Sequence, residues 1–271
     1  RRVSTLPTPR TREGRAALAA VIADPGVALV ALDYDGTLAP IVDRPEDAVA
    51  HPRAAPALRA IASAGTRVAI VTGRPAGEAV RLGGLADVPG LVVLGHYGLD
   101  RWSEGQVVAP EPHPGVAAAR RAVADMVADG PAGLALEDKG HSVALHSRRA
   151  ADPSGVLTAL RPRVEQLARE TGLVVTPGRH VLELRPPDTD KGTALRALVA
   201  ELRTTSVVFV GDDVGDLAAV RALRELDVSR LVVCSDSVES PSELREQADL
   251  VVPGPPGVVS FLESLAQVLD S

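Results

Sequence analysis

The sequence contains few aromatic residues and almost no cysteine. Aromatic side chains make up 2% of the 271 residues, so the core must be filled by valine, leucine, alanine and isoleucine. The single cysteine, Cys234, excludes a disulfide within the chain, and its apolar surroundings at 231–234 predict a small buried residue. No apolar run approaches the roughly 18 residues that a membrane-spanning helix needs. These absences predict a globular protein without a membrane partner.

An excess of basic charge is also missing. The formal net charge is −6 at pH 7, whereas proteins that bind nucleic-acid backbones usually present basic surfaces. We therefore expect no nucleic-acid partner and, by default, a cytoplasmic enzyme. The length suits two domains better than one compact core. The arginine-rich beginning of the chain is expected to be a solvated tail (Arg1, Arg2, Arg10, Arg12, Arg15).

Lysine is scarce although cations are not. Lysine and arginine together number 29, yet lysine occurs only at Lys139 and Lys191. The two side chains are not interchangeable at a tight site, because arginine is a planar fork and lysine a compact charge. Lys191 begins a helical pattern, where a cation faces the helix dipole unfavourably. We therefore expect an anion close to Lys191.

The most informative segment is residues 27–37, an apolar run that ends in Asp33-Tyr-Asp35-Gly36-Thr37. The run is typical of a strand covered on both faces, and in parallel sheets ligands bind beyond the carboxyl ends of the strands. Two carboxylates there repel each other, so a metal cation and a reacting group would explain them. A calcium loop would place glutamate where Val42 stands. An ordinary turn stays open as an alternative.

Three more segments carry matching chemistry. Thr72, Gly73 and Arg74 follow a strand pattern at 66–72. Asp212 and Asp213 follow another at 206–211, with Asp216 three residues further on, and Lys191 precedes a helical pattern. Each segment is a weak signal by itself, and together they are a strong one for a single polar, acidic edge of a sheet.

The order of elements predicts two domains. Strands near 27–33, 66–72, 90–95, 206–211, 230–234 and 249–252 alternate with helical patterns, which is typical of a parallel sheet with helices on both faces. These segments form one discontinuous domain, 1–111 with 187–271. Between them, 112–186 reads helix, hairpin, helix, hairpin, which predicts a four-stranded sheet with both helices on one face.

The other face of that smaller sheet is predicted to be polar. Strand alternation separates Val143 and Leu145 from His146 and Arg148, and Leu182 and Leu184 from Glu183. His146 or Arg148 alone would fit a solvated strand face. Together with Glu137, Lys139 and Glu183, they predict a lid over a polar ligand.

In this order the motifs resemble the haloacid dehalogenase superfamily, and more closely its trehalose-phosphatase family. Residues 32–41 (Leu-Asp-Tyr-Asp-Gly-Thr-Leu-Ala-Pro-Ile) are similar to that family's opening motif. Residues 137–148 fit its insert signature Glu-x-Lys-x₆-His-x-Arg, and Glu183-Leu-Arg185-Pro186 is a third match. The resemblance covers roughly residues 15 to 270. It implies a Rossmannoid α/β core with an inserted α+β cap of the C2 type.

The resemblance also implies a reaction: Mg²⁺-dependent hydrolysis of trehalose 6-phosphate to trehalose and phosphate through an aspartyl-phosphate. Asp33 would be the nucleophile and Asp35 the acid and base, while Thr72, Gly73 and Lys191 would hold the phosphoryl group. Mg²⁺ would bind Asp33, the carbonyl of Asp35 and Asp212, with Asp213 and Asp216 in support. The remaining substrate-binding residues would be Arg74, His96, Glu137, Lys139, His146, Arg148 and Glu183. A trehalose-6-phosphate synthase is the implied companion enzyme.

Three positions depart from the family pattern. Gly215 and Leu217 stand where the last acidic motif usually has threonine and glutamate, and Ser147 replaces a tyrosine between His146 and Arg148. For His96 a core histidine is an equal alternative. Another lidded sugar-phosphate phosphatase, a phospho-accepting receiver domain and an inactive domain beside a synthase also stay open as functions.

Overall fold

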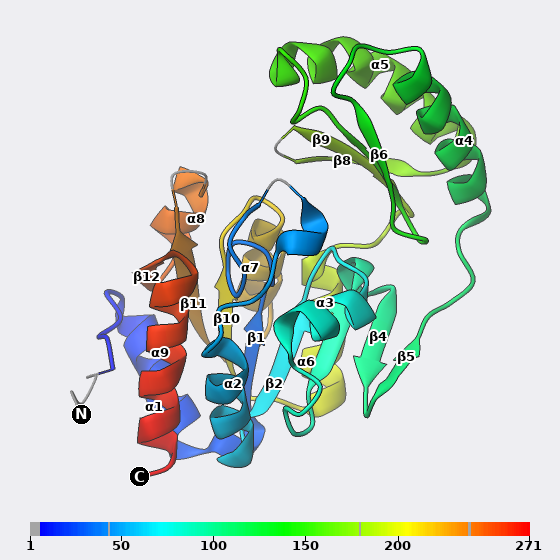
Figure 1. Cartoon of the computed structure of the whole chain (residues 1–271). Coiled ribbons are helices and arrows are strands. Elements are labelled where there is room, and N and C mark those ends of the chain that lie inside the picture. The colour runs from blue at the N-terminus through cyan, green and yellow to red at the C-terminus, as the bar shows by residue number, and fades with distance from the viewer. Residues whose placement is uncertain (1–5, 43, 179, 238–239) are drawn as a thin grey trace. The chain divides into compact units, whose positions relative to one another are not determined.

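A computed structural model describes residues 6–42, 44–178, 180–237 and 240–271 (Figure 1). The chain divides into two compact units. The core unit comprises Arg1–Val108 and Asp190–Ser271, and the inserted unit comprises Ala109–Thr189. The junctions therefore follow Val108 and Thr189, whereas the sequence placed them after residues 111 and 186.

The core unit is built on one eight-stranded sheet (Figure 1). Its strands, in spatial order, are β12 (Leu250–Pro253), β11 (Ser229–Asp236), β10 (Ser206–Gly211), β1 (Ala28–Leu32), β2 (Arg67–Val71), β3 (Val92–Gly95), β4 (Asp100–Ser103) and β5 (Gln106–Val108). From β12 to β3 all neighbours pair in parallel, which confirms the predicted parallel sheet. The antiparallel hairpin β4–β5, which the sequence reading missed, extends one edge.

Helices cover both faces of this sheet, as predicted. Successive residues of β1 alternate between two apolar clusters: Val30 and Leu32 belong to one, Leu29 and Ala31 to the other. All five residues of β1 are buried, which explains the unbroken apolar run. The helices of the first face are α1 (Arg12–Ala23), α2 (Ala54–Ser63), α3 (Ala76–Gly83) and α9 (Gly254–Leu269); those of the second are α6 (Lys191–Leu202), α7 (Asp216–Glu225) and α8 (Ser242–Gln247).

The parallel register aligns the carboxyl ends of the central strands. Leu32 of β1 pairs with Val210 of β10 and with Ile70 of β2. The residues that follow each strand therefore emerge at one edge of the sheet. The backbone N–H of Asp33 continues the ladder by donating to the Val210 carbonyl across 2.9 Å. This edge is the place at which the sequence predicted the site.

The inserted unit is a four-stranded antiparallel sheet with two helices on one face, as predicted. The strands are, in spatial order, β6 (Ala135–Asp138), β7 (Val143–His146), β9 (Val181–Arg185) and β8 (Val174–Gly178), and the helices are α4 (Pro114–Ala128) and α5 (Pro153–Thr171). Val143, Leu145, Leu182 and Leu184 pack with both helices in one apolar cluster. The opposite face carries Glu137, His146 and Glu183, which confirms the predicted alternation.

The structure corrects two expectations. Strand β7 ends at His146, so Arg148 lies in the following turn and strand alternation does not place its side chain. The predicted solvated tail is ordered where it is described: Arg12 and Arg15 belong to α1, and Arg10 Nε donates to the Ala248 carbonyl across 2.8 Å. Arg1 and Arg2 of that tail lie outside the described residues.

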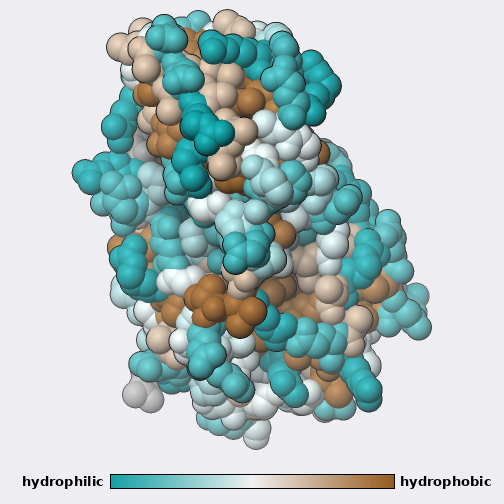
Figure 2. Space-filling view, turned by 90° about the vertical axis from the view of Figure 1, so that its right-hand side faces the viewer, coloured by the Kyte–Doolittle hydropathy of each residue, from teal (hydrophilic) through white to brown (hydrophobic). Residues whose placement is uncertain are grey.

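The described surface and core agree with the composition. Cys234 is fully buried in the apolar cluster under α6 and α7, as expected. The face shown in Figure 2 is mostly hydrophilic, with smaller hydrophobic patches among the polar residues. Among the described residues, the large hydrophobic side chains that are exposed are valines and one isoleucine. Within the described ranges, no helix is both long and apolar enough to span a bilayer.

Candidate active site

A buried ion-pair network occupies the carboxyl edge of the core sheet. Asp33, Lys191 and Asp216 are each at most 4% exposed. Lys191 Nζ lies 2.8 Å from Asp33 Oδ1 and 2.9 Å from Asp216 Oδ1. The N-cap Asp190 accepts a hydrogen bond from the Thr193 N–H and fixes the start of α6, from which Lys191 projects. The anion expected beside Lys191 is thus a pair of carboxylates.

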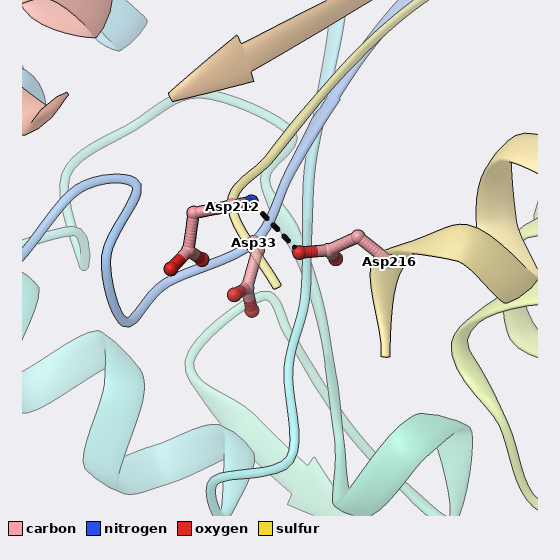
Figure 3. Close-up of side chains that lie close together, drawn as sticks. All are labelled: Asp33, Asp212 and Asp216. Atoms are coloured by element: carbon pink, nitrogen blue, oxygen red, sulfur yellow. Dashed lines mark hydrogen bonds between the residues drawn. The ribbon is translucent and has the colours of Figure 1, made fainter. Parts of the chain in front are cut away.

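Asp212 completes an acidic group in the same place. One carboxylate oxygen from each of Asp33, Asp212 and Asp216 lies within 4.8 Å of the others, and all three residues are buried (Figure 3). The approach of Asp212 depends on Gly36, whose φ is +73° and at which a Cβ would overlap the Asp212 carboxylate. Only glycine meets both demands without strain.

Burial shapes the protonation of this group. Loss of solvent raises the pKa of Asp33 and of Asp212 well above the ordinary value, against the opposing attraction of Lys191. Burial raises the pKa of Asp216 to about 6. Burial alone would lower the pKa of Lys191, but Asp216 and Asp33 beside it raise it well above its ordinary value. Lys191 therefore stays charged while the carboxylates resist full ionisation.

The donor set fits a divalent cation such as Mg²⁺. Asp212 Oδ1 is buried and has no hydrogen-bond partner among the described residues, which leaves a hard oxygen donor available. Asp216 is more occupied. Its Oδ2 accepts from the backbone N–H of Asp212 at 2.9 Å (Figure 3). The same oxygen accepts from the Asp213 N–H at 3.0 Å, and Oδ1 accepts from Lys191. Asp33 and Asp212 are thus the better placed of the three to hold the ion.

Asp213, a predicted support for the metal, lies outside this group. Its side chain is exposed, and its Oδ1 accepts a hydrogen bond from the Asp216 N–H across 3.2 Å. That bond satisfies a free N–H at the start of α7. Asp213 therefore contributes to the start of α7, where its side chain and its backbone carbonyl both accept from the Asp216 N–H.

Asp35 is held by an arginine rather than by the acidic group. Arg74 Nε and Nη2 donate to the two Asp35 oxygens, each across 2.7 Å. Arg74 Nη1 donates to Glu78 Oε1 at 2.7 Å and to the Pro45 carbonyl at 2.9 Å. The Arg74 guanidinium also lies 5.5 Å from the centre of the Tyr34 ring. Four of its five N–H groups are therefore used within the protein, which leaves little of Arg74 for a substrate.

Thr72 and Gly73 lie beside these residues at the end of β2. Thr72 is 1% exposed, and its Oγ1 accepts from the Arg74 N–H at 3.1 Å, which leaves the hydroxyl proton for another acceptor. Gly73 lies against the Tyr97 ring, where a Cβ would come within 2.8 Å of its Cζ. The backbone N–H of Tyr97 in turn donates to the Thr72 carbonyl at 2.9 Å.

His96 is a buried histidine with a specific partner. It is 3% exposed, and its Nδ1 lies 3.1 Å from Asp100 Oδ1. Asp100 Oδ2 accepts from the Ala76 N–H at the start of α3. His96 and Tyr97 both have positive φ, 47° and 60°, which marks a constrained turn after β3. His96 is therefore buried as a core histidine would be, in contact with Asp100. A role for His96 in substrate binding stays a prediction.

The inserted unit gathers a second polar cluster on its helix-free face. Glu137 Oε2 lies 2.8 Å from His146 Nε2, and Lys139 Nζ lies 3.3 Å from Glu183 Oε2. Glu183 is buried, and its Oε1 accepts from the Ser142 hydroxyl at 2.5 Å. The structure thus brings together four of the five residues predicted for the lid. Arg148, the fifth, is half-buried in the turn after β7.

Comparison with known proteins identifies the family of this chain. A family model of trehalose-phosphatases matches residues 31–251, from β1 to β12. The chain belongs to the trehalose-phosphatase family. A solved structure described as a trehalose-6-phosphate phosphatase related protein is similar, with 26% identity and a TM-score of 0.71 over 88% of this chain and 97% of that one. Haloacid dehalogenase-like hydrolases are also among the structural neighbours, which confirms the predicted fold class.

The curated relatives of this trehalose-phosphatase family member are longer proteins. A Mycobacterium avium trehalose-phosphate phosphatase is 34% identical over 213 residues, covering 72% of this chain and 51% of the relative. An uncharacterized glycosyl hydrolase of Mycobacterium tuberculosis is 35% identical over 255 residues, covering 88% of this chain and 18% of the relative. The chain thus spans from about a fifth to about half of the length of these relatives.

The departures from the family pattern have structural explanations. Leu217 is 4% exposed and packs in the apolar cluster under α6 and α7, so the glutamate expected there is replaced by a core residue. Gly215 precedes α7 as its N-cap. Ser147 is fully buried and donates to the Pro153 carbonyl at 2.7 Å, so it serves the fold and does not substitute for a substrate contact.

Two contacts of the site were not predicted from the sequence. Glu78, in the first turn of α3, pairs with Arg74, which lies four residues earlier and before the helix begins. Ser142 binds Glu183 across the sheet, a contact that follows from strand pairing and not from local sequence.

Proposed function

We propose that this chain is a Mg²⁺-dependent phosphatase that hydrolyses trehalose 6-phosphate to trehalose and phosphate through an aspartyl-phosphate. The observation that carries the proposal is the buried Asp33–Lys191–Asp216 network beside the open oxygen of Asp212, in a chain of this family. The inserted unit carries a cluster of residues that matches the family signature (Glu137, Lys139, His146 and Glu183). This match supports the assignment of a sugar phosphate as the substrate.

In the first step, a carboxylate oxygen of Asp33 attacks phosphorus while the bond from phosphorus to the sugar oxygen breaks. The leaving alkoxide needs a proton, and Asp35 provides it. Lys191, the Thr72 hydroxyl and the Gly73 amide hold the phosphoryl oxygens and neutralise their charge. Bound Mg²⁺, held by Asp33, Asp212 and the Asp35 carbonyl, would supply further positive charge at the phosphoryl group.

In the second step, Asp35 takes a proton from water, the water oxygen attacks phosphorus, and the bond to Asp33 breaks. Phosphate leaves and both carboxylates return to their starting states. Arg74 orients Asp35 for both steps, because two N–H groups of its guanidinium hold the two Asp35 oxygens. Arg74 thus acts on Asp35 in this scheme.

Recognition of the sugar belongs to the inserted unit in this proposal. A disaccharide presents hydroxyl groups, and paired donors and acceptors distinguish such groups by leaving wrong ones unmatched. Lys139 with Glu183, and His146 with Glu137, form two such pairs. A trehalose-6-phosphate synthase would supply the substrate.

A substrate panel tests this function. Phosphate release is measured from trehalose 6-phosphate, glucose 6-phosphate and sucrose 6-phosphate, with Mg²⁺ and with excess EDTA. We expect Mg²⁺-dependent release, fastest from trehalose 6-phosphate. A preference for another sugar phosphate would retain the mechanism and reject the substrate, whereas no release from any of them would reject the enzyme.

A further inference from the structure

A buried serine at the carboxyl end of β11 contacts the loop that carries Asp33 and Asp35. Ser235 is fully buried, and its hydroxyl donates to the Gly36 carbonyl across 2.7 Å. The two residues are 199 positions apart, so the sheet alone brings them together. In the parallel register Cys234 pairs with Gly211, which places Ser235 next to Asp212. Ser235 therefore links the carboxyl end of β11 to the loop that follows β1.

The backbone of Gly36 is held on both sides. Its N–H donates to the Ala39 carbonyl across 2.7 Å, and its own carbonyl accepts from Ser235. The peptide group between Asp35 and Gly36 is planar and trans, so its N–H and its carbonyl point in opposite directions. The bond to Ala39 therefore directs the Asp35 carbonyl away from Ala39. This carbonyl is the one assigned to Mg²⁺ in the proposed function.

Gly36 also lies against the carboxylate of Asp212, another of the groups assigned to Mg²⁺. A Cβ at Gly36 would overlap the Asp212 carboxylate, so backbone and carboxylate are in direct contact. Any movement of Gly36 changes the spacing between the Asp35 carbonyl and Asp212. Without the Ser235 hydroxyl, the Gly36 carbonyl would be a buried acceptor lacking this bond, and the loop would shift to find another donor.

We propose that Ser235 is a positioning residue that sets the spacing between the Asp35 carbonyl and the Asp212 carboxylate for a divalent cation. This inference rests on the proposed function. Ser235 contacts neither substrate nor ion in this scheme. Its effect passes through the Gly36 carbonyl, and it should appear first in cation affinity.

The test measures Mg²⁺ binding without substrate. The midpoint of thermal unfolding is followed as Mg²⁺ alone is added to wild type, Ser235→Ala, Ser235→Cys and Ser264→Ala. Ser264 is a matched control, because it is also buried and donates to a backbone carbonyl, that of Ser260, within α9. We expect the apparent Kd for Mg²⁺ to rise about tenfold in Ser235→Ala. In Ser235→Cys, which keeps a weak donor of similar size, the apparent Kd should rise less. In Ser264→Ala the apparent Kd should equal that of wild type.

A second measurement separates this role from general damage. At saturating Mg²⁺, phosphate release from trehalose 6-phosphate by Ser235→Ala should recover most of the wild-type rate, with KM unchanged. A wild-type Mg²⁺ affinity in Ser235→Ala, or an equal loss in Ser264→Ala, would overturn the role of Ser235. A wild-type protein that binds Mg²⁺ but releases no phosphate contradicts the proposed function alone, and the Mg²⁺ titration then still supports or overturns the role of Ser235.

Discussion

Replacing Gly36 by alanine should disable the site far more than it destabilises the fold. The φ of Gly36 is +73°, a conformation that costs a non-glycine residue about 1–2 kcal/mol. In addition, a Cβ there would overlap Asp212 Oδ2 and would lie only 2.7 Å from Oδ1, well inside the 3.4 Å of ordinary contact. The Asp212 carboxylate would have to move by roughly 1 Å, and misplacement of that size can lower activity about 100-fold.

Two other glycines provide matched controls for the backbone cost. Gly84 and Gly90 have similar positive φ values, 60° and 63°, but a Cβ at either meets no atom within 4 Å. Gly84→Ala and Gly90→Ala should therefore lose about 1–2 kcal/mol of unfolding free energy and keep their activity. Gly36→Ala should lose at least that much stability and about 100-fold in kcat/KM.

The assays are urea unfolding for stability and phosphate release from trehalose 6-phosphate for activity. The comparison depends on the difference between variants with the same backbone penalty. If Gly36→Ala kept the activity of the two control variants, contact between Gly36 and Asp212 would not matter for catalysis. The assignment of Asp212 to the metal would then lose its structural support.

Three further results are expected. Asp33→Asn should abolish turnover while the unfolding free energy holds or rises, because one charge leaves a repulsive buried cluster; more than a few per cent residual activity would reject Asp33 as the nucleophile. Lys139→Ala should lower kcat/KM about ten- to a hundredfold on the sugar phosphate but little on a small aryl phosphate, whereas Lys191→Ala should lower both alike; an equal loss on both substrates for Lys139→Ala would remove the inserted unit from specificity. The stabilisation by Mg²⁺, measured as the rise in Tm, should grow from pH 5 to pH 8. Burial raises the pKa of Asp33 and of Asp212, the two carboxylates assigned to the ion, well above the ordinary value. The folded protein without Mg²⁺ therefore holds extra protons at low pH and loses stability as the pH rises and these protons dissociate. A Tm rise independent of pH would show that these carboxylates do not exchange protons for Mg²⁺.

The core site was readable from the sequence because a parallel sheet orders its strand ends. Buried strands need apolar residues at every position, so the polar residues at which such runs stop mark one edge. Asp33 and Asp212 follow β1 and β10 in this way, and Thr72 follows β2. The position of Lys191 at a helix start predicted a nearby anion, and the structure supplies Asp33 and Asp216.

Short exposed elements were not readable in the same way. Strand β5 comprises Gln106–Val108, and all three residues are exposed, so no burial period marks it. Its partner β4 has only four residues. Such a hairpin is specified by pairing to the edge of an existing sheet, which the local sequence does not contain. The contact between Ser235 and Gly36 could not be predicted for the same reason, because it joins residues 199 positions apart.

The roles of individual carboxylates depend on which of their lone pairs are already used. The sequence placed Asp212, Asp213 and Asp216 together as a metal-binding motif, and their spacing alone does not rank them. In the structure, Asp216 uses about three of its four acceptor positions on Lys191 and two backbone N–H groups. Asp212 has a buried oxygen with no partner among the described residues. Asp216 thus orients Lys191 and the turn after β10, whereas Asp212 keeps an oxygen available for a cation that Asp33 can also bind.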